Sequence, residues 1–177
     1  SNDLQNILFL DIETVPAFRK LDEVPEVLRG LWIEKNSKKR KRKTEDDEAT
    51  AETADDCNYG DAGLSPEFGR IICISLGRFE GGTEDSHFKT HSLFSHNEVE
   101  LLAQFAKVLE KYPSHMLCAH NGKGFDFPFL GKRFLINGLS LPTQLDLMGK
   151  KPWDIPHIDT NELWAFGSKG PGGGAAL

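Results

Sequence analysis

Two carboxylates stand two positions apart in the chain, directly after an apolar run. Residues 7–10 read Ile-Leu-Phe-Leu, and Asp11 and Glu13 follow with one isoleucine between them. The run predicts a buried strand, and side chains two apart on a strand share one face. Carboxylates on one face repel each other unless a cation lies between them, and their hard oxygen atoms suit Mg²⁺ or Mn²⁺ rather than Zn²⁺. An isolated pair of this kind is more often a strand that has simply reached water.

A third carboxylate, Asp126, follows a second short apolar stretch. Residues 116–119 predict another buried strand, residues 120–125 form a Gly-rich turn, and a helix is expected to begin near Asp126. Strand ends and helix starts converge at one edge of an α/β sheet. An acid at a helix start also has a simpler role, since it stabilises the positive end of the helix dipole. Together with Asp11 and Glu13, Asp126 would complete a cradle of three carboxylates for metal ions.

The elements that would position these residues alternate between strands and helices. Pro16 ends the first strand because it cannot donate to a ladder. Ser95 and Glu98 match a capping box, which predicts a helix that begins there and ends at Pro113. The other expected elements are a helix at 24–33, a strand at 70–77, its hairpin partner at 86–94, and a short helix near 161–166 within a loop-rich stretch, 139–167. This order predicts an α/β layered domain.

Composition argues against several classes of protein. The chain of 177 residues carries a net charge of −6 and three scattered cysteines, and it contains no run of about 20 apolar residues. These features argue against a membrane protein, a disulfide-stabilised secreted protein and a four-cysteine zinc site, and they predict a cytoplasmic protein. The acidity also argues against nonspecific coating of duplex DNA. It does not argue against an enzyme that grips nucleic acid through metal ions.

Charge is segregated along the chain. Seven basic residues fall between Lys35 and Lys43, and seven acidic residues fall between Glu45 and Asp56. We interpret residues 36–61 as a charged, mobile excursion, helical or disordered, from one domain that spans residues 1–167. Residues 168–177 are rich in glycine and are typical of a linker or a scar.

Two motifs resemble those of the DEDD-type 3′–5′ exonucleases. Residues 8–14, Leu-Phe-Leu-Asp-Ile-Glu-Thr, are similar to the first motif of that family. Residues 121–130, Asn-Gly-Lys-Gly-Phe-Asp-Phe-Pro-Phe-Leu, are similar to the second motif of the proofreading domains of B-family DNA polymerases. Residues 67–75 and 149–160 resemble stand-alone bacterial exonucleases related to those polymerases. The resemblance implies an RNase H-like, three-layer α/β domain with a mixed central sheet.

The same resemblance implies a metal-dependent 3′–5′ exonuclease. Such an enzyme hydrolyses phosphodiester bonds at the 3′ end of single-stranded nucleic acid, with DNA favoured here, by means of two Mg²⁺ or Mn²⁺ ions. In that family the residues that match Asp11, Glu13 and Asp126 hold the metals and are catalytic. The implied nucleic-acid contacts, by family match or by position beside the site, are Thr14, Asn121, Lys123 and Phe125.

One feature of the exonuclease family is missing. Its third motif, Tyr or His followed four residues later by Asp, does not occur, and His157 and Asp159 have the wrong spacing. We therefore expect a fold shortened at its C-terminal helices, weak metal binding, little hydrolysis, and a structural role for Asp159. One alternative is a catalytically impaired nucleic-acid-binding module. A less favoured one is an aspartyl-phosphate phosphatase, whose motif would need Asp rather than Glu13.

Overall fold

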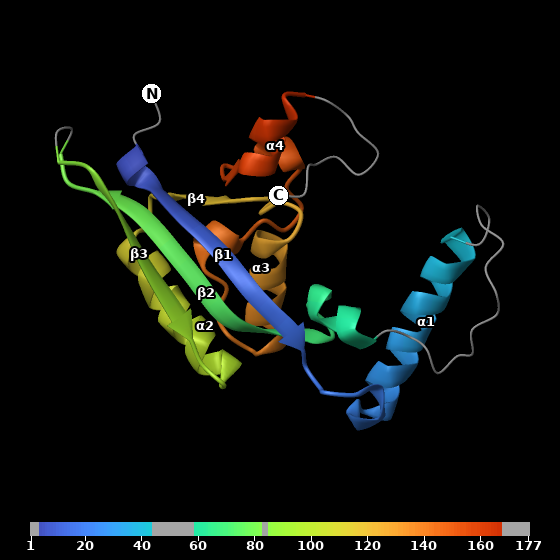
Figure 1. Ribbon diagram of the computed structural model, residues 1–177. Helices are drawn as coiled ribbons and strands as arrows, with labels where there is room; N and C mark the ends of the chain where they lie inside the picture. The colour runs from blue at the N-terminus through green and yellow to red at the C-terminus, as the bar shows by residue number, and fades with distance from the viewer. Residues whose placement is uncertain (1–3, 44–58, 83–84, 168–177) are drawn as a thin grey trace. The chain divides into compact units, whose positions relative to one another are not determined.

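The computed structural model describes residues 4–43, 59–82 and 85–167 (Figure 1). The acidic run and the glycine-rich tail 168–177 lie outside the described residues. Where the sequence indicates one domain, the chain divides into two compact units: residues 1–13 with 71–177, and residues 14–70. No helix within the described ranges combines the length and apolar character needed to cross a bilayer.

A five-stranded sheet of order β3-β2-β1-β4-β5 runs through the first unit. β1 pairs with β4, and β4 with β5, in parallel, whereas β2 and β3 form an antiparallel hairpin. The strands are β1 (Ile7–Pro16), β2 (Gly69–Glu80), β3 (His87–Phe94), β4 (Met116–Ala119) and β5 (Ile158–Asp159). This sheet confirms the predicted α/β class and its mixed strand directions. The sequence analysis misses β5, because two residues are too few to show a periodicity.

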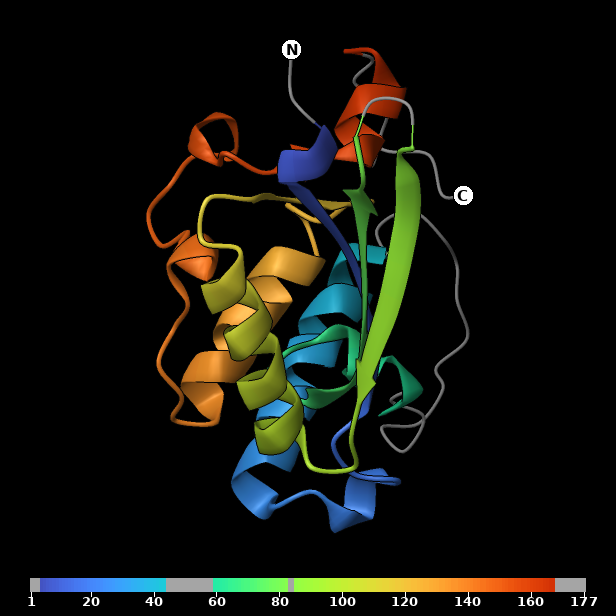
Figure 2. The same ribbon diagram turned by 90° about the vertical axis from the view of Figure 1, so that its left-hand side faces the viewer.

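Helices α2 (Glu98–Lys111) and α3 (Asp126–Ile136) lie on one face of this sheet (Figures 1 and 2). β1 supplies the sheet side of the core, because Leu8, Leu10 and Ile12 are buried at alternate positions. Phe105 of α2 and Phe127 of α3 belong to the same apolar cluster and are fully buried. The alternation along β1 therefore fixes which of its side chains point away from the helices.

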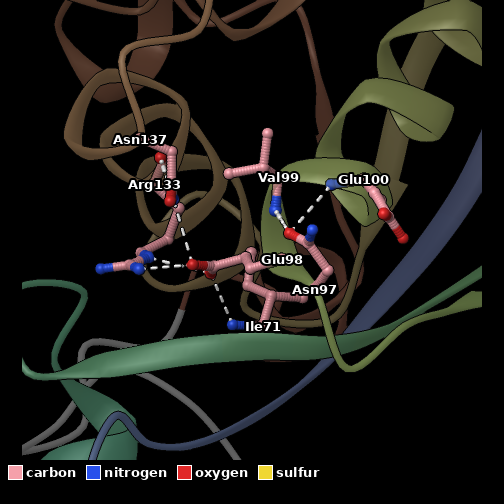
Figure 3. Close-up of polar contacts among 7 residues, drawn as sticks. All are labelled: Ile71, Asn97, Glu98, Val99, Glu100, Arg133 and Asn137. Atoms are coloured by element: carbon pink, nitrogen blue, oxygen red, sulfur yellow. Dashed lines mark hydrogen bonds and ion pairs between the residues drawn. The ribbon is translucent and has the colours of Figure 1, made fainter.

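A buried carboxylate, Glu98, ties α2 to α3 and to the start of β2 (Figure 3). It accepts hydrogen bonds from Ile71 N at 2.7 Å, Arg133 Nε at 2.9 Å and Asn137 Nδ2 at 3.0 Å, and Arg133 Nη2 also donates to it. Burial would raise the pKa of Glu98, but these hydrogen bonds outweigh it, so the pKa is lowered. Glu98 is therefore ionised and fully paired inside the first unit.

The start of α2 differs from the predicted capping box. The N-cap is Asn97, whose side chain accepts from Val99 N and Glu100 N (Figure 3). Ser95 Oγ instead accepts from Asn97 N, two residues further along the chain. Glu98 does not return to the helix start, because its carboxylate is taken by Arg133 and by the backbone of β2. Glu98 therefore contacts Arg133, which is distant in the sequence, in place of the local backbone contact that the capping-box pattern predicts.

The second unit has a small core of its own. Helix α1 (Glu26–Lys43) and the 3₁₀ helix η4 (Tyr59–Leu64) bring Trp32 within 5.6 Å of Tyr59 and 5.1 Å of Phe68, measured between ring centroids. α1 continues ten residues beyond the expected helix end at residue 33, through the basic run to Lys43, since Lys and Arg favour helix without apolar periodicity. Tyr59 is buried, so the predicted excursion extends too far toward residue 61.

Candidate active site

The two carboxylates of the first motif lie on the side of β1 that faces away from the core. Asp11 and Glu13 are exposed, whereas Leu10 and Ile12 between and before them are buried. This is the two-residue alternation of a strand, so the structure places both carboxylates on one face as their spacing predicts. Thr14 follows directly on the same strand and is half-buried.

Asp126 lies beside the same stretch of β1. It is the first residue of α3 and is 3% exposed. Its Oδ1 accepts a hydrogen bond from the backbone N–H of Ile12 at 3.3 Å, so the carboxylate lies next to the peptide bond between Asp11 and Ile12. Residues 115 positions apart in the chain are thus brought to one place.

The environment of Asp126 disfavours its ionised form. Burial raises its pKa to about 6, and the negative charge of Asp11 acts in the same direction. Hydrogen bonds from its own backbone N–H and from Ile12 N partly oppose these effects, and the charge of Asp159 adds a smaller increase. Asp11 and Asp126 therefore repel each other when both are ionised.

The predicted cradle of three carboxylates is only partly seen. Among the described residues, no three His, Cys, Asp or Glu side chains lie close enough together to hold a metal ion. The donor chemistry nevertheless fits Mg²⁺ or Mn²⁺, because carboxylate oxygens are the ligands that these hard cations bind. The structure sets Asp126 near enough to Asp11 for the charge of one to raise the pKa of the other, and shared metal ligation by Asp11, Glu13 and Asp126 stays a prediction.

Asp159 fixes the turn that carries the second motif. Its Oδ1 accepts from Asn121 N at 2.8 Å and its Oδ2 from Lys123 N at 3.0 Å, and the residue is 4% exposed. The same carboxylate caps α4 (Thr160–Ala165) by accepting from Asn161 N at 2.9 Å. These contacts agree with the structural role expected for Asp159. A sequence signal that indicates the capping part of this role, and that the sequence analysis does not use, is the Asp159-x-x-Glu162 spacing, which is a helix-capping pattern.

The turn itself needs its two glycines. Asn121 takes a left-handed backbone conformation with φ of 57°, and its carbonyl accepts from Gly124 N and Phe125 N. A Cβ on Gly124 would lie 2.5 Å from Asn121 Oδ1, and one on Gly122 would lie 2.6 Å from the Ala119 side chain. Glycine therefore allows the backbone to fold tightly just before α3, with Asn121 exposed at the surface.

The other two predicted nucleic-acid contacts of this turn have partners within the protein. Lys123 Nζ forms an ion pair with Glu162 Oε2 at 2.7 Å, and the lysine side chain is 15% exposed. The Phe125 ring is half-buried and lies 5.3 Å from the Phe129 ring. The structure thus shows a local role for each side chain, and their contacts with nucleic acid stay predictions.

Two histidines near the second motif are structural links that the sequence analysis does not assign. His157 Nδ1 accepts from Leu117 N at 3.2 Å, and Nε2 lies 2.6 Å from the Gln144 carbonyl, to which it donates. Burial lowers the pKa of His157, which favours this neutral form. His120 Nδ1 lies 3.0 Å from Thr160 Oγ1. No ligand spacing marks either residue in the sequence.

Asp11 lines a shallow groove on the sheet face turned away from the core. Phe9 and Phe88 form part of its wall, with ring centroids 5.5 Å apart, and the Ser75 and Ser92 hydroxyls are 3.2 Å apart within it. Phe88 is 48% exposed. The groove therefore places aromatic rings and hydroxyl groups next to a carboxylate of the first motif.

Comparison with known proteins defines the class to which this fold and site belong. The model of the RNase H superfamily matches residues 61–164, more than half of the chain. The chain belongs to the RNase H superfamily. This membership supports a nuclease-like function, and superfamily members generally use divalent metal ions. The matched range contains Asp126, whereas Asp11 and Glu13 precede it.

A solved structure of the family B DNA polymerase from the hyperthermophilic archaeon Pyrobaculum calidifontis is similar with a TM-score of 0.39 and 14% sequence identity. The alignment covers 76% of this chain but 11% of the polymerase chain. At that TM-score the likeness carries no argument. No curated protein matches the chain.

Proposed function

We propose that this protein is a metal-dependent 3′–5′ exonuclease that acts on single-stranded nucleic acid, with DNA as the favoured polymer. The observation that carries the proposal is the hydrogen bond from Ile12 N to Asp126 Oδ1, because it sets a carboxylate of α3 beside the first motif. The motif pattern supports the DEDD subtype, and membership of the RNase H superfamily supports a nuclease-like function.

The carboxylates of Asp11, Glu13 and Asp126 would hold Mg²⁺ or Mn²⁺. Two such ions, when bound, activate a water and stabilise the leaving 3′ oxygen at phosphorus. The protein's own contribution is to orient the oxygen ligands. Ile12 N–H fixes one oxygen of Asp126, while Asp11 and Glu13 are exposed and therefore accessible to a cation from solvent. The positive charge would also offset the repulsion between Asp11 and Asp126.

The turn before α3 would position the 3′ end of the strand. Asn121 is exposed and held by Asp159 through its backbone, so its amide can donate to a phosphate or sugar oxygen without loss of loop entropy. Phe125 offers the exposed part of its ring to a base. Thr14, which directly follows Glu13 in the chain, would contact the terminal nucleotide, as the resemblance to the exonucleases implies.

The test is Asp11→Asn in the full chain, with Asp146→Asn as the matched control. Asp146 is exposed and lies outside the proposed site. A 5′-labelled single-stranded oligonucleotide is incubated with Mn²⁺, and products are resolved by length. Since little hydrolysis is expected from the sequence, the incubation is long. We expect a slow ladder that shortens from the 3′ end for the parent and the control, and shortening that is at least about 100-fold slower still in Asp11→Asn. Equal cleavage by all three proteins, or shortening from the 5′ end, contradicts the proposal.

A second candidate function is a nucleic-acid-binding module without hydrolysis. It is favoured by the lack, among the described residues, of three metal-binding side chains in one place. The same assay separates the two functions. Tight binding of the oligonucleotide with no Mn²⁺-dependent cleavage by the parent protein, even at long incubation, selects the binding module.

A further inference from the structure

A second hollow in the first unit is lined by basic side chains. It lies between the β2–β3 hairpin and the last turns of α2, and Leu8 and Tyr112 contribute to its walls. We call it the basic pocket. Its positively charged residues outnumber its one carboxylate, Glu80, and are Arg78, Lys89, Lys107 and Lys111. In a chain with a net charge of −6, this concentration of positive charge is local.

The charges of the basic pocket come from facing positions on separate elements. Arg78 and Lys89 are partners in the register of the hairpin. Lys107 and Lys111 are four residues apart on α2 and therefore share one helix face. Glu80 pairs with Arg78 and lies 3.7 Å from Lys89 Nζ, which leaves the helix lysines without a carboxylate among the described residues.

Tyr112 organises the cationic side of the pocket. The Arg78 guanidinium lies 4.9 Å from the centroid of the tyrosine ring, and Lys111 Nζ lies 5.5 Å from it. Cations over an aromatic face are held by its quadrupole, so these two groups are restrained beside each other despite their like charge. An anion in the pocket would relieve that repulsion.

We infer that the basic pocket binds backbone phosphates of the nucleic-acid strand whose 3′ end is processed at Asp11, an inference that rests on the proposed function. Leu76, Gly77 and Thr90 line both the basic pocket and the groove that contains Asp11, so the two hollows adjoin at the hairpin. The groove lies on the sheet face turned away from the core and the basic pocket on the face that α2 covers. Because β3 is the edge strand of the sheet, a strand that leaves the groove can reach Lys107 and Lys111 around that edge. The pocket contributes charge, and the groove contributes aromatic rings and hydroxyls.

The experiment measures binding of a labelled single-stranded oligonucleotide by fluorescence anisotropy in EDTA over a range of salt concentrations. The variant Lys107→Ala/Lys111→Ala removes two exposed charges and keeps helix propensity high. Each phosphate contact contributes about 0.7 to the slope of log affinity against log salt for single strands, so two contacts predict a fall of about 1.4. At low salt we expect affinity to drop at least about tenfold. Arg19→Ala/Lys20→Ala removes the same charge from exposed positions in the second unit and serves as control.

The outcomes separate the pocket from the proposed function. If Lys107→Ala/Lys111→Ala leaves the affinity and the salt slope unchanged, the basic pocket does not bind the strand. Equal losses of affinity in this variant and in the control also contradict the inference. A second arm titrates inorganic phosphate, and loss of phosphate binding with unchanged strand binding also overturns it. Because EDTA prevents metal-dependent cleavage, the two hypotheses fail independently. If binding depends on Lys107 and Lys111 but the protein never cleaves the oligonucleotide, the exonuclease proposal is wrong and the phosphate-binding role of the basic pocket still holds.

Discussion

Glu98 and Asp126 are both buried carboxylates at the first residue of a helix, yet their surroundings shift their pKa values in opposite directions. Glu98 is 8% exposed and Asp126 is 3% exposed. Burial acts against the charge of each, but Glu98 has Arg133 and two further donors, and its pKa is lowered. Asp126 accepts backbone hydrogen bonds and faces the like charge of Asp11, and its pKa is raised to about 6.

The opposite pKa shifts distinguish two kinds of buried carboxylate. Glu98 is neutralised by partners within the protein, whereas Asp126 would need a ligand to neutralise its charge. The network around Glu98 contains its own cation, so nothing from solvent is needed to satisfy it. Asp126 lacks a cation among its described partners, and the neighbouring carboxylate of Asp11 makes its ionised state still less favourable. Strongly perturbed groups of this kind gather at functional sites. A divalent cation would supply the charge that Arg133 supplies to Glu98.

The largest change in the free energy of unfolding is expected from removing Arg133, the cation that pairs with Glu98. Arg133→Met leaves the Glu98 carboxylate buried without its charged partner, which we expect to lower the free energy of unfolding by about 3–5 kcal/mol. The measurement is urea denaturation at neutral pH. The double variant Glu98→Gln/Arg133→Met should recover part of the loss, because no unpaired charge then remains. A loss below about 1 kcal/mol in the single variant would show that water or another group replaces Arg133.

The sequence predicts the local parts of both regions and misses the long-range partners. β1 and β4 are predicted because apolar runs of that length are typical of buried strands. α2 is predicted as well, but its assigned cap is wrong. The Ser95-x-x-Glu98 pattern is local, whereas the real partner of Glu98, Arg133, lies 35 residues further along the chain. No short-range pattern contains that contact.

In the candidate site too, the sequence predicts local positions but not long-range contacts. The motifs place Asp126 at a helix start, and the structure has it there, whereas Asp11 and Glu13 lie within β1 rather than at its end, because the strand continues to Pro16. The hydrogen bond between Ile12 and Asp126 joins elements 114 residues apart, so its existence depends on how α3 packs on the sheet. The capping role of Asp159 was readable from its spacing to Glu162. Its hold on the turn of Asn121 depends on β5, which has no sequence signal.

Asp126→Asn is expected to change the free energy of unfolding by an intermediate amount and to stabilise the protein, whereas Arg133→Met destabilises it. Folding raises the pKa of Asp126 from 3.8 to about 6, so the ionised group destabilises the folded state. In EDTA at pH 7 the amide should raise the free energy of unfolding by about 1–3 kcal/mol. The gain should be full above about pH 6 and vanish below about pH 4.

Glu98→Gln provides the control for Asp126→Asn. Its pKa is lowered on folding, so its stabilising charge is fully present above the unfolded pKa of 4.5 and is lost as pH falls through the folded value. Denaturation curves at several pH values should therefore show a gain for Asp126→Asn that grows between about pH 4 and pH 6, and a loss for Glu98→Gln that is full above pH 4.5 and shrinks at lower pH. Two losses would contradict the comparison between the carboxylates.

The smallest effect is expected at an exposed carboxylate, Glu162. It is 53% exposed on its side chain and pairs with Lys123, whose contact with nucleic acid is predicted from its place in the second motif. Glu162→Gln should lower the free energy of unfolding by less than about 1 kcal/mol, since exposed ion pairs contribute little. The freed ammonium should tighten oligonucleotide binding in EDTA by up to about fivefold, which corresponds to the same ~1 kcal/mol. Glu26→Gln removes an equal charge from an exposed position in the second unit. If both variants tighten binding equally, the gain comes from net charge alone, and the ion pair with Glu162 does not restrain a strand-binding lysine.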